Sequence, residues 1–337
     1  MKRTNRLLSL ILCCFMLSGC GQAASGHSSV SDGAGQANRM ERPTVADVQD
    51  TAVSFLDDLG RTVTVDRPAR TAALLGSFAQ VWTLAGGSLC AAANDAWEDL
   101  ALDLPEDTVN LGSLTEMSME LVLSSEPDFI LASVNTKRHM EWRDTLEATG
   151  IPTAYFEVNV FEDYLRMLKI CTEITGRDDL YEQNGAAVQR QVDAVLARSR
   201  ERMTGQQAPQ VLSLTASATN LYVKNSTDNV LGTMLRDLGC VNIADSDTAL
   251  LETLSMEHIL LADPDCIFIV QRGSDTDGMR ANVQRTLMDD PAWSSLTAVQ
   301  NNRVYFMDKT LYALKPNHRW GQAYEQLEDL LYHENAA

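Results

Sequence analysis

The sequence predicts an α/β protein with two lobes, each a parallel-type sheet flanked by helices, joined by a long connecting helix. Three observations predict this fold. Residues 118–130 (SMELVLSSEPDFI) and 255–267 (SMEHILLADPDCI) read almost alike, which indicates two similar lobes. Short β-type runs alternate with helical stretches in both halves, as in parallel sheets covered by helices. Residues 161–203 are rich in helix formers and lack proline, which predicts the connection.

The chain begins with features of an export signal. Residues 1–6 are basic, and residues 7–17 form an apolar run that is too short to span a membrane. The run ends on LSGC, which resembles the lipobox of bacterial lipoproteins. We therefore expect residues 1–19 to be a lipoprotein signal peptide and Cys20 to be acylated, which anchors the protein to the extracytoplasmic face of the cell membrane. An ordinary secretory signal with an incidental cysteine is the alternative.

A flexible tether is expected over residues 20–52, because this stretch is rich in Gly, Ala, Ser and Gln and poor in large apolar residues. Such a tether has a typical end-to-end distance of roughly 30 Å. Loss of the basic leader changes the formal charge from −19 to −22. A chain this acidic is not expected to bind nucleic acid.

The first lobe, residues 53–160, is expected to alternate strands and helices. We predict strands at 63–65, 71–75, 89–93, 129–132 and 153–157, and helices at 78–85 (capped by Ser77 and ended by Gly86), at the first copy of the repeat, and at 137–149 (ended by Gly150). In each copy of the repeat, a serine can cap a short helix that proline ends before a buried strand.

Residues 161–204 are expected to form one or two long connecting helices. In the second lobe, residues 205–337, we predict strands at 211–214, at the end of the repeat and at 304–307, and helices at 229–238, in the repeat and at 319–332.

Neither the cysteines nor the histidines form a metal-site pattern. The four cysteines beyond the lipidation site are widely spaced in apolar surroundings, so buried thiols are expected, with one disulfide left open (Cys90, Cys171, Cys240 and Cys266). The five histidines are too scattered for a convincing cluster. We expect no metal site and no cofactor.

The chain resembles the substrate-binding lipoproteins of ABC importers for iron-siderophore complexes, haem and cobalamin, the class with two lobes joined by a rigid helix. The resemblance covers almost the whole mature chain and is carried by residues 57–63 (DDLGRTV), the two repeat copies and residues 293–305 (WSSLTAVQNNRVY). It implies a monomer that holds a small metal chelate between its lobes without chemistry. The solute itself can contain iron or cobalt.

The resemblance also assigns a role to Glu120 and Glu257, which occupy equivalent positions in the repeat. In this family the matching glutamates dock onto arginines of the importer's membrane subunits, one lobe per subunit. A carboxylate at an exposed helix N-terminus can accept a bidentate arginine contact. The alternative is that each glutamate only stabilises its own helix.

Two pairs of residues are candidates for contact with the solute. Phe78 and Trp82 lie four residues apart on one predicted helix, so they share a face that either stacks on a planar ligand or packs in the core. Tyr222 and Lys224 are placed in a polar loop after a strand, where an aromatic beside a cation suits an anionic or chelated ligand.

The best cleft candidate is the loop at residues 315–320 (KPNHRW), before the last helix. Lys315, Asn317 and Arg319 offer polar and cationic groups for carboxylate, catecholate or phosphate, and Trp320 could cover an apolar surface. Cations at a helix start oppose its dipole, which favours a bound anion over the alternative of a solvated helix start.

Two other functions compete with solute capture. One is an exported chelatase-like enzyme, but the sequence has no G-x-S-x-G, H-E-x-x-H or P-loop motif. The other is a surface lipoprotein that uses the same fold to bind a protein partner. We expect a non-enzymatic receptor.

Overall fold

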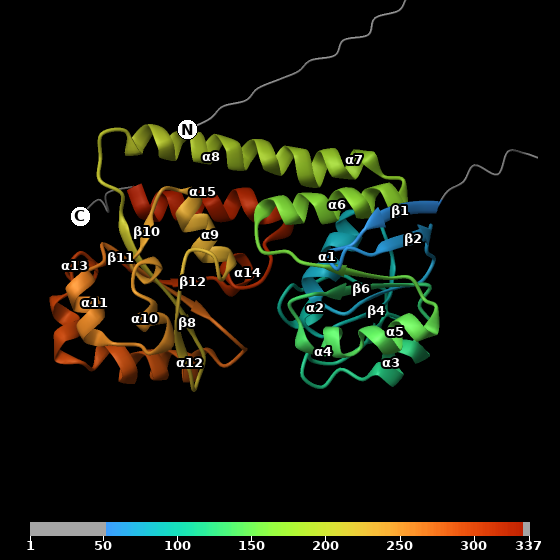
Figure 1. Cartoon of the computed structure of the whole chain (residues 1–337), viewed down its shortest axis with the longest axis horizontal. Coiled ribbons are helices and arrows are strands. Elements are labelled where there is room, and N and C mark those ends of the chain that lie inside the picture. Colours follow the sequence, from blue (N-terminus) through green and yellow to red (C-terminus); the bar gives the residue numbers. More distant parts are fainter. Residues whose placement is uncertain (1–51, 333–337) are drawn as a thin grey trace, which may run out of the picture. The chain divides into compact units, whose positions relative to one another are not determined.

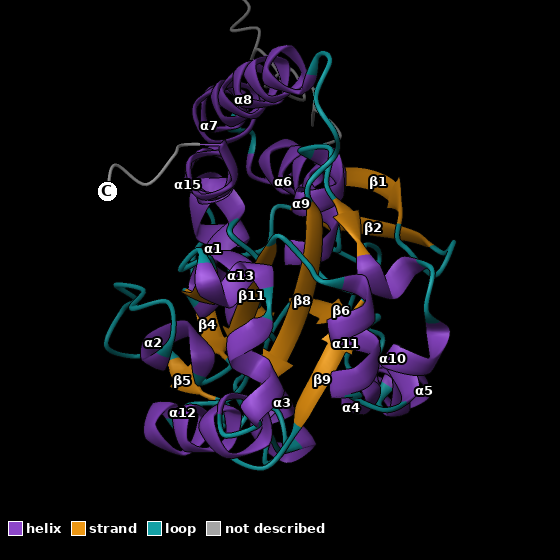
Figure 2. Ribbon diagram, turned by 90° about the vertical axis from the view of Figure 1, so that its left-hand side faces the viewer, coloured by secondary structure: helices purple, strands orange, loops and turns teal. Residues whose placement is uncertain are grey.

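The computed structural model describes residues 52–332. The predicted leader, the lipidation site Cys20, nearly all of the tether and residues 333–337 lie outside the described residues. Among the described residues the strands form two five-stranded sheets and one two-stranded sheet, with helices on the sheet faces (Figures 1 and 2). The predicted α/β class with two sheets is confirmed.

The first sheet has the strand order β5-β4-β3-β6-β7, and all its pairings are parallel. A hairpin of β1 and β2 precedes it. The bounds are β1 (Ala52–Leu56), β2 (Thr62–Asp66), β3 (Thr71–Ala73), α1 (Gly76–Leu84), β4 (Leu89–Ala92), α2 (Asp95–Glu98), β5 (Val109–Asn110), α3 (Met119–Ser124), β6 (Phe129–Ser133), α4 (Lys137–Glu141), α5 (Arg143–Thr149) and β7 (Thr153–Phe156).

The second sheet has the order β10-β8-β11-β12 with parallel pairings, and β9 adds an antiparallel pairing to β8. The bounds are β8 (Gln210–Ala216), β9 (Leu221–Lys224), α9 (Val230–Asp237), β10 (Val241–Asn242), α10 (Thr248–Glu252), α11 (Met256–Ala262), β11 (Cys266–Gln271), α12 (Thr276–Val283), α13 (Thr297–Gln300), β12 (Val304–Met307), α14 (Lys309–Tyr312) and α15 (Trp320–Tyr332).

Two long helices connect the sheets. The first, α6 (Phe161–Thr175), ends at Gly176, whose φ of 70° is the left-handed conformation that glycine tolerates. The chain continues through α7 (Asp178–Tyr181) and a π-helical turn into α8 (Ala187–Met203), which packs along α15 (Figure 1). The prediction of one or two long helices here is confirmed.

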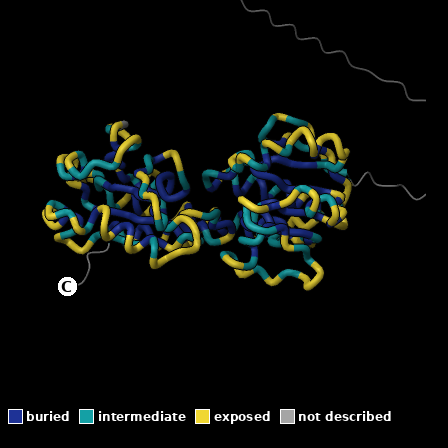
Figure 3. The backbone as a smooth tube through the Cα atoms, turned by 90° about the horizontal axis from the view of Figure 1, so that it is seen from below, coloured by how far each residue is buried: buried dark blue, intermediate teal, exposed yellow. Residues whose placement is uncertain are grey.

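The largest buried cluster includes residues from both sheets and from the connecting helices. It contains Trp82 of α1, Tyr164 of α6, Val211 of β8 and Trp320 of α15. In Figure 3 the buried stretches of the backbone, in dark blue, lie mainly inside, and the exposed stretches, in yellow, lie mainly at the outside. Burial of each large apolar side chain contributes roughly 1.5–3 kcal/mol to the free energy of folding. This shared cluster therefore stabilises the packing of both sheets against the connecting helices.

The repeat has the same structure in both copies, as predicted. Helix α3 leads into the buried strand β6, and α11 leads into the buried strand β11. The backbone N–H of Asp128 donates to the carbonyl of Arg70, and that of Asp265 donates to the carbonyl of Gln210. Both aspartate carboxylates accept backbone N–H groups at the start of the neighbouring strand. The aspartate of each copy thus sets the strand register.

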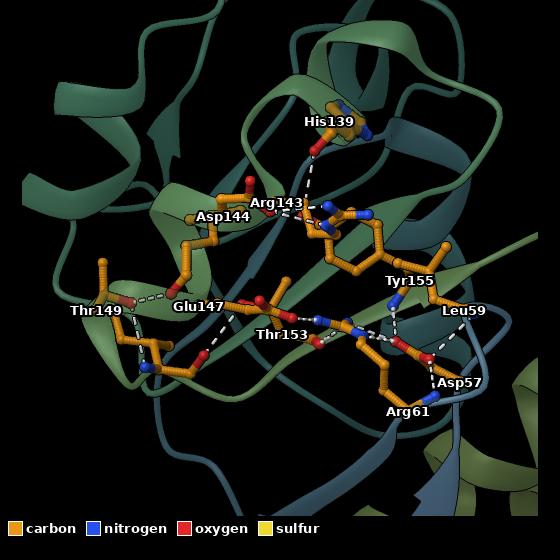
Figure 4. Close-up of polar contacts among 12 residues, drawn as sticks. Asp57, Leu59, Arg61, His139, Arg143, Asp144, Glu147, Thr149, Thr153 and Tyr155 are labelled. Carbon is orange, nitrogen blue, oxygen red and sulfur yellow. Dashed lines mark hydrogen bonds and ion pairs between the residues drawn. The ribbon is translucent and has the colours of Figure 1, made fainter.

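The turn between β1 and β2, residues 57–61, is tied to the first sheet through Arg61 (Figure 4). The Asp57 carboxylate accepts the backbone N–H of Arg61 at 3.0 Å and its guanidinium at 2.6 Å. The same guanidinium donates to Glu147 at 2.6 Å and to the carbonyl of Thr153 at 2.9 Å, and lies 4.9 Å from the ring centre of Tyr155. This turn is a structural anchor for the hairpin.

Three local predictions were wrong. Ser77 does not cap α1, because the helix begins at Gly76 and so already contains Ser77. The Asp95 carboxylate accepts the N–H of Gly76 at 2.9 Å. Ser118 makes no side-chain cap, whereas Ser255 accepts the N–H of His258 at 3.4 Å. The helix predicted at 137–149 is divided into α4 and α5, with Trp142 between them.

Candidate functional site

A cavity of about 370 Å³ lies at the carboxyl ends of the second sheet's strands and also touches the first lobe. Thr215 and Gln271 come from the ends of β8 and β11, and Lys309 begins the helix that follows β12. From the first lobe, Asp99 follows α2 and Leu114 follows β5. In parallel sheets the crevice outside the carboxyl strand ends is the usual ligand site.

Local structure explains how the cationic side chains reach this cavity. Arg272 follows β11 directly, and its N–H donates to the carbonyl of Ala216 at 2.7 Å, which holds it at the sheet edge. The Asp308 carboxylate accepts the N–H of Thr310 at 2.8 Å and so caps α14, which places Lys309 as the first residue of that helix.

The cavity concentrates positive charge in an acidic chain. Its lining contains the cations Lys224, Arg272 and Lys309 and a single acidic residue, Asp99. Lys309 is paired with Asp99, with 2.6 Å between Nζ and Oδ1. Within residues 52–332, the side chains of Lys224 and Arg272 have no ion pair or hydrogen bond. The arrangement is suited to a small anion that offers several oxygen atoms.

Tyr222 and Lys224 lie on a strand, not in the predicted loop, because residues 221–224 form β9 and pair with β8. Residues two apart on a strand point to the same side, so the two side chains share a face. The structure places Lys224 in the cavity lining. Tyr222 is 46% exposed and does not line this cavity.

Phe78 and Trp82 are core residues in this structure, each 1% exposed. The ring of Phe78 meets Phe156 edge-on, and that of Trp82 meets Phe129 with 5.7 Å between ring centres. The indole N–H of Trp82 donates to the carbonyl of Ser88 at 2.8 Å. Of the two interpretations of this pair, core packing fits the structure, because buried rings cannot stack on a ligand.

The loop at 315–320 joins the two lobes and does not line the cavity. Asn317 is 1% exposed and has a φ of 54°, and its amide donates to the carbonyl of Ser77 at 2.9 Å and to Gln80 at 2.8 Å. Trp320 is fully buried, with 5.6 Å between its ring centre and that of Phe161. Its predicted role as a ligand cover is therefore wrong for this conformation.

Two cations of that loop, Lys315 and Arg319, lie next to residues that line the cavity. The Arg319 guanidinium donates to the hydroxyl of Thr310 at 3.2 Å, next to Lys309. Lys315 follows Leu314 of the lining and is half-buried. Burial lowers the pKa of Lys315 to about 8, although the nearby carboxylates of Asp163 and Glu157 oppose this shift.

Lys315→Met is expected to raise the free energy of unfolding at pH 7 by ~1–2 kcal/mol, because it removes a poorly solvated ammonium. The pKa is about 8 in the folded protein against 10.5 ordinarily. Between these values the unfolded chain binds more protons, so wild-type stability should rise with pH relative to the variant. Urea unfolding at pH 7 and pH 10 measures this, with exposed Lys137→Met as the control. A variant that is less stable at pH 7 would contradict the expectation.

The two repeat glutamates are exposed and lie at the second position of their helices, Glu120 in α3 and Glu257 in α11. In the described part of the chain neither side chain has an ion-pair or hydrogen-bond partner. Leu261, one turn after Glu257 on the same face, is 88% exposed, whereas Ser124 stands at the equivalent position of α3.

Other sequence predictions concern cysteines, metals and membranes. All four cysteines within 52–332 are free, three of them buried and Cys90 half-buried.

Over the same residues, no group of three or more His, Cys, Asp or Glu side chains could hold a metal ion. Burial lowers the pKa of His139 to about 4. None of the described helices has the length and apolar character needed to cross a membrane.

Sequence reasoning missed Arg272, Lys309 and Asp99. Arg272 and Lys309 each stand within two residues after the end of a strand, which is the position where parallel sheets present ligand-binding groups. That signal was available in the sequence. Asp99 had no such signal, because it follows a short helix and approaches Lys309 only in the folded protein.

Comparisons with known proteins agree on one family. The family described as "Periplasmic binding protein" matches residues 72–311. The chain is 24% identical over 324 residues to the Fe(3+)-citrate-binding protein YfmC of Bacillus subtilis, covering 91% of this chain and 90% of that protein. It is 21% identical to the putative ABC transporter substrate-binding lipoprotein YhfQ of Bacillus subtilis, covering 94% and 93%.

Among solved structures, the fold is similar to that of Staphylococcus aureus SirA complexed with staphyloferrin B. The TM-score is 0.65 at 21% sequence identity, and the match covers 84% of this chain and 98% of that one.

Proposed function

The chain belongs to the periplasmic binding protein family, and we propose that it captures a small anionic ferric chelate and delivers it to an ABC importer. The observation that carries the proposal is the cavity with three cations: Lys224 and Arg272, which have no side-chain partner among residues 52–332, and Lys309. A cation that lines a cavity and has no partner in the described chain can donate to carboxylate oxygens with little rearrangement.

The size of the cavity supports a compact solute. Its volume of about 370 Å³ is near the lower end of small-molecule sites, which run from roughly 300 to 1,000 Å³. Ferric complexes of hydroxycarboxylates are compact and keep negative charge on their outer oxygens. The curated relative named for ferric citrate and the solved structure with staphyloferrin B support this class.

We further propose that the loop at 315–320 supports the site instead of touching the solute. Asn317 ties it to α1, and Arg319 contacts Thr310 beside Lys309. These contacts would hold α14 and its cation in place. Tyr222 remains a candidate at the mouth of the site, because it is exposed on the same strand face as Lys224.

For delivery, we propose that Glu120 and Glu257 bind arginines of the importer's membrane subunits. Their exposure, their lack of partners within the described residues and their equivalent helix positions support this role. The exposed Leu261 beside Glu257 has a serine counterpart in the other lobe, so the second lobe would add an apolar contact.

The remaining parts of the chain fit a membrane-anchored receptor. We propose a signal peptide at 1–19, acylated Cys20, a tether at 20–52, lobes at 53–160 and 205–337, and the connection at 161–204. The relative YhfQ is named as a putative lipoprotein, which supports the anchor. The protein would act as a monomer on the extracytoplasmic face of the membrane, without chemistry on its solute.

Isothermal titration calorimetry of the full chain in mild detergent tests the proposed ligand. We expect saturable binding of ferric citrate or a ferric carboxylate siderophore with a micromolar or lower dissociation constant, and no comparable binding of iron-free citrate. Haem and cobalamin are titrated in the same way. Preferential binding of either of these, or no binding at all, would contradict the proposed ligand class.

A further inference from the structure

One ion pair in the cavity joins the two lobes. Lys309 at the start of α14 and Asp99 after α2 are 210 residues apart in the sequence, yet Nζ and Oδ1 are separated by 2.6 Å. Both side chains are largely shielded, with exposures of 23% and 24%. The ammonium also lies 3.4 Å from the carbonyl of Gly273.

This pair differs from the other charges of the cavity. Lys224 and Arg272 have no partner among residues 52–332, so only one of the three lining cations is neutralised, and the neutralising group comes from the opposite lobe. A structural need for charge balance would apply to all three cations. The pairing of Lys309 alone therefore points to a specific role for Asp99.

We infer that Asp99 is a built-in competitor of the ligand. This inference rests on the proposed function and deepens it. In the ligand-free protein the carboxylate occupies Lys309, and a bound chelate replaces it with one of its own anionic groups. Binding thus exchanges an interlobe ion pair for a protein–ligand pair. Chelates with an outer anionic group that reaches Lys309 are favoured over those that fill only the Lys224 and Arg272 positions.

The physical reason is that the carboxylate has two effects on an anionic ligand. It holds a cation that the ligand needs, and its own charge repels the ligand in a partly shielded site. The Asp99 side chain is 24% exposed, so water can hydrate part of the carboxylate once the ligand has replaced it. Asp99 therefore sets the selectivity among chelates by lowering the affinity for anionic ligands.

The first test measures affinity by calorimetry with ferric citrate. Asp99→Asn is expected to tighten binding about fivefold, because it removes both the competitor and the repulsion. Glu98→Gln makes the same charge change at the exposed neighbouring residue and should change affinity less than twofold. In a Lys309→Gln background the gain from Asp99→Asn should largely disappear, since no cation remains to be freed.

The possible outcomes separate the inference from the proposed function. Binding by wild type and Asp99→Asn with equal affinity would overturn the inference and leave the function standing. The same gain with and without Lys309 would reduce Asp99 to general repulsion and overturn the exchange. If neither protein binds any ferric chelate, the proposed function fails and the inference fails with it.

A second measurement tests the pair without ligand. The chain has only six lysines, so acylation of each can be followed by peptide mass spectrometry. Asp99→Asn should make Lys309 react severalfold faster than in wild type, with Lys224 as the internal reference, because the Asp99 carboxylate no longer holds Nζ at 2.6 Å and shields it from the reagent. Glu98→Gln should leave the rate unchanged. An unchanged Lys309 rate in Asp99→Asn would overturn the inference.

Discussion

Replacing Lys224 and Arg272 together by glutamine is expected to weaken ferric-chelate binding by about a hundredfold or more. A hydrogen bond to a charged group contributes ~1.5–3 kcal/mol, and a tenfold change in affinity corresponds to about 1.4 kcal/mol. Two such contacts therefore account for at least two orders of magnitude. Calorimetric titration with ferric citrate measures the loss.

The free energy of unfolding of this variant should be nearly unchanged. Neither side chain has an ion pair or hydrogen bond among the described residues, so the substitutions break no such contact. Surface changes of this kind usually stay within about 0.5 kcal/mol. Arg236→Gln with Arg280→Gln is the matched control: both arginines belong to the second lobe, are exposed and lie outside the cavity. An equal loss of affinity in the control would show that net charge, and not the cavity, attracts the ligand.

Reversing Glu120 and Glu257 together to arginine is expected to abolish iron uptake while solute affinity stays within about twofold. Like charges placed opposite each other at an interface cost several kcal/mol, so two reversals would prevent docking on arginine-bearing membrane subunits. Neither residue lines the cavity, which explains why binding should survive. Uptake of radioactive ferric citrate by cells that carry only the variant measures the effect.

The control for this experiment reverses two exposed acids on the connecting and last helices, Glu201→Arg and Glu325→Arg. It changes the net charge by the same amount and should support normal uptake. Equal loss in both variants would indicate a general charge effect. Normal uptake by the Glu120 and Glu257 variant would reject docking and leave these residues as helix-stabilising groups.

The fold could be predicted because its signals are local. Apolar runs, helix formers and end signals such as Gly150 and Gly176 act within a few residues, and both glycines do end helices. The repeat predicted two equivalent helix–strand units, and Asp128 and Asp265 make matching contacts. One local error reflects a distant group, because the Asp95 carboxylate, and not Ser77, accepts a backbone N–H at the start of α1.

The site could be predicted only in part. The sequence predicts a ligand role for Lys224, which lines the cavity, and for Trp320, which is buried. For Phe78 and Trp82 it leaves ligand stacking and core packing open, and the structure buries both rings. A helical pair of aromatic residues has the same spacing whether it faces a core or a cleft, because periodicity gives the shared face and not what covers it.

The sequence by itself therefore determined the α/β class, the two related lobes, the long connection and the family resemblance, because each is encoded in contiguous stretches. Only the tertiary structure decided which cations meet. Lys224, Arg272 and Lys309 reach one cavity because the strands of a parallel sheet end at the same edge, and Asp99 joins them from the other lobe. No local pattern encodes such a meeting, since it depends on how two sheets from distant parts of the sequence are packed together.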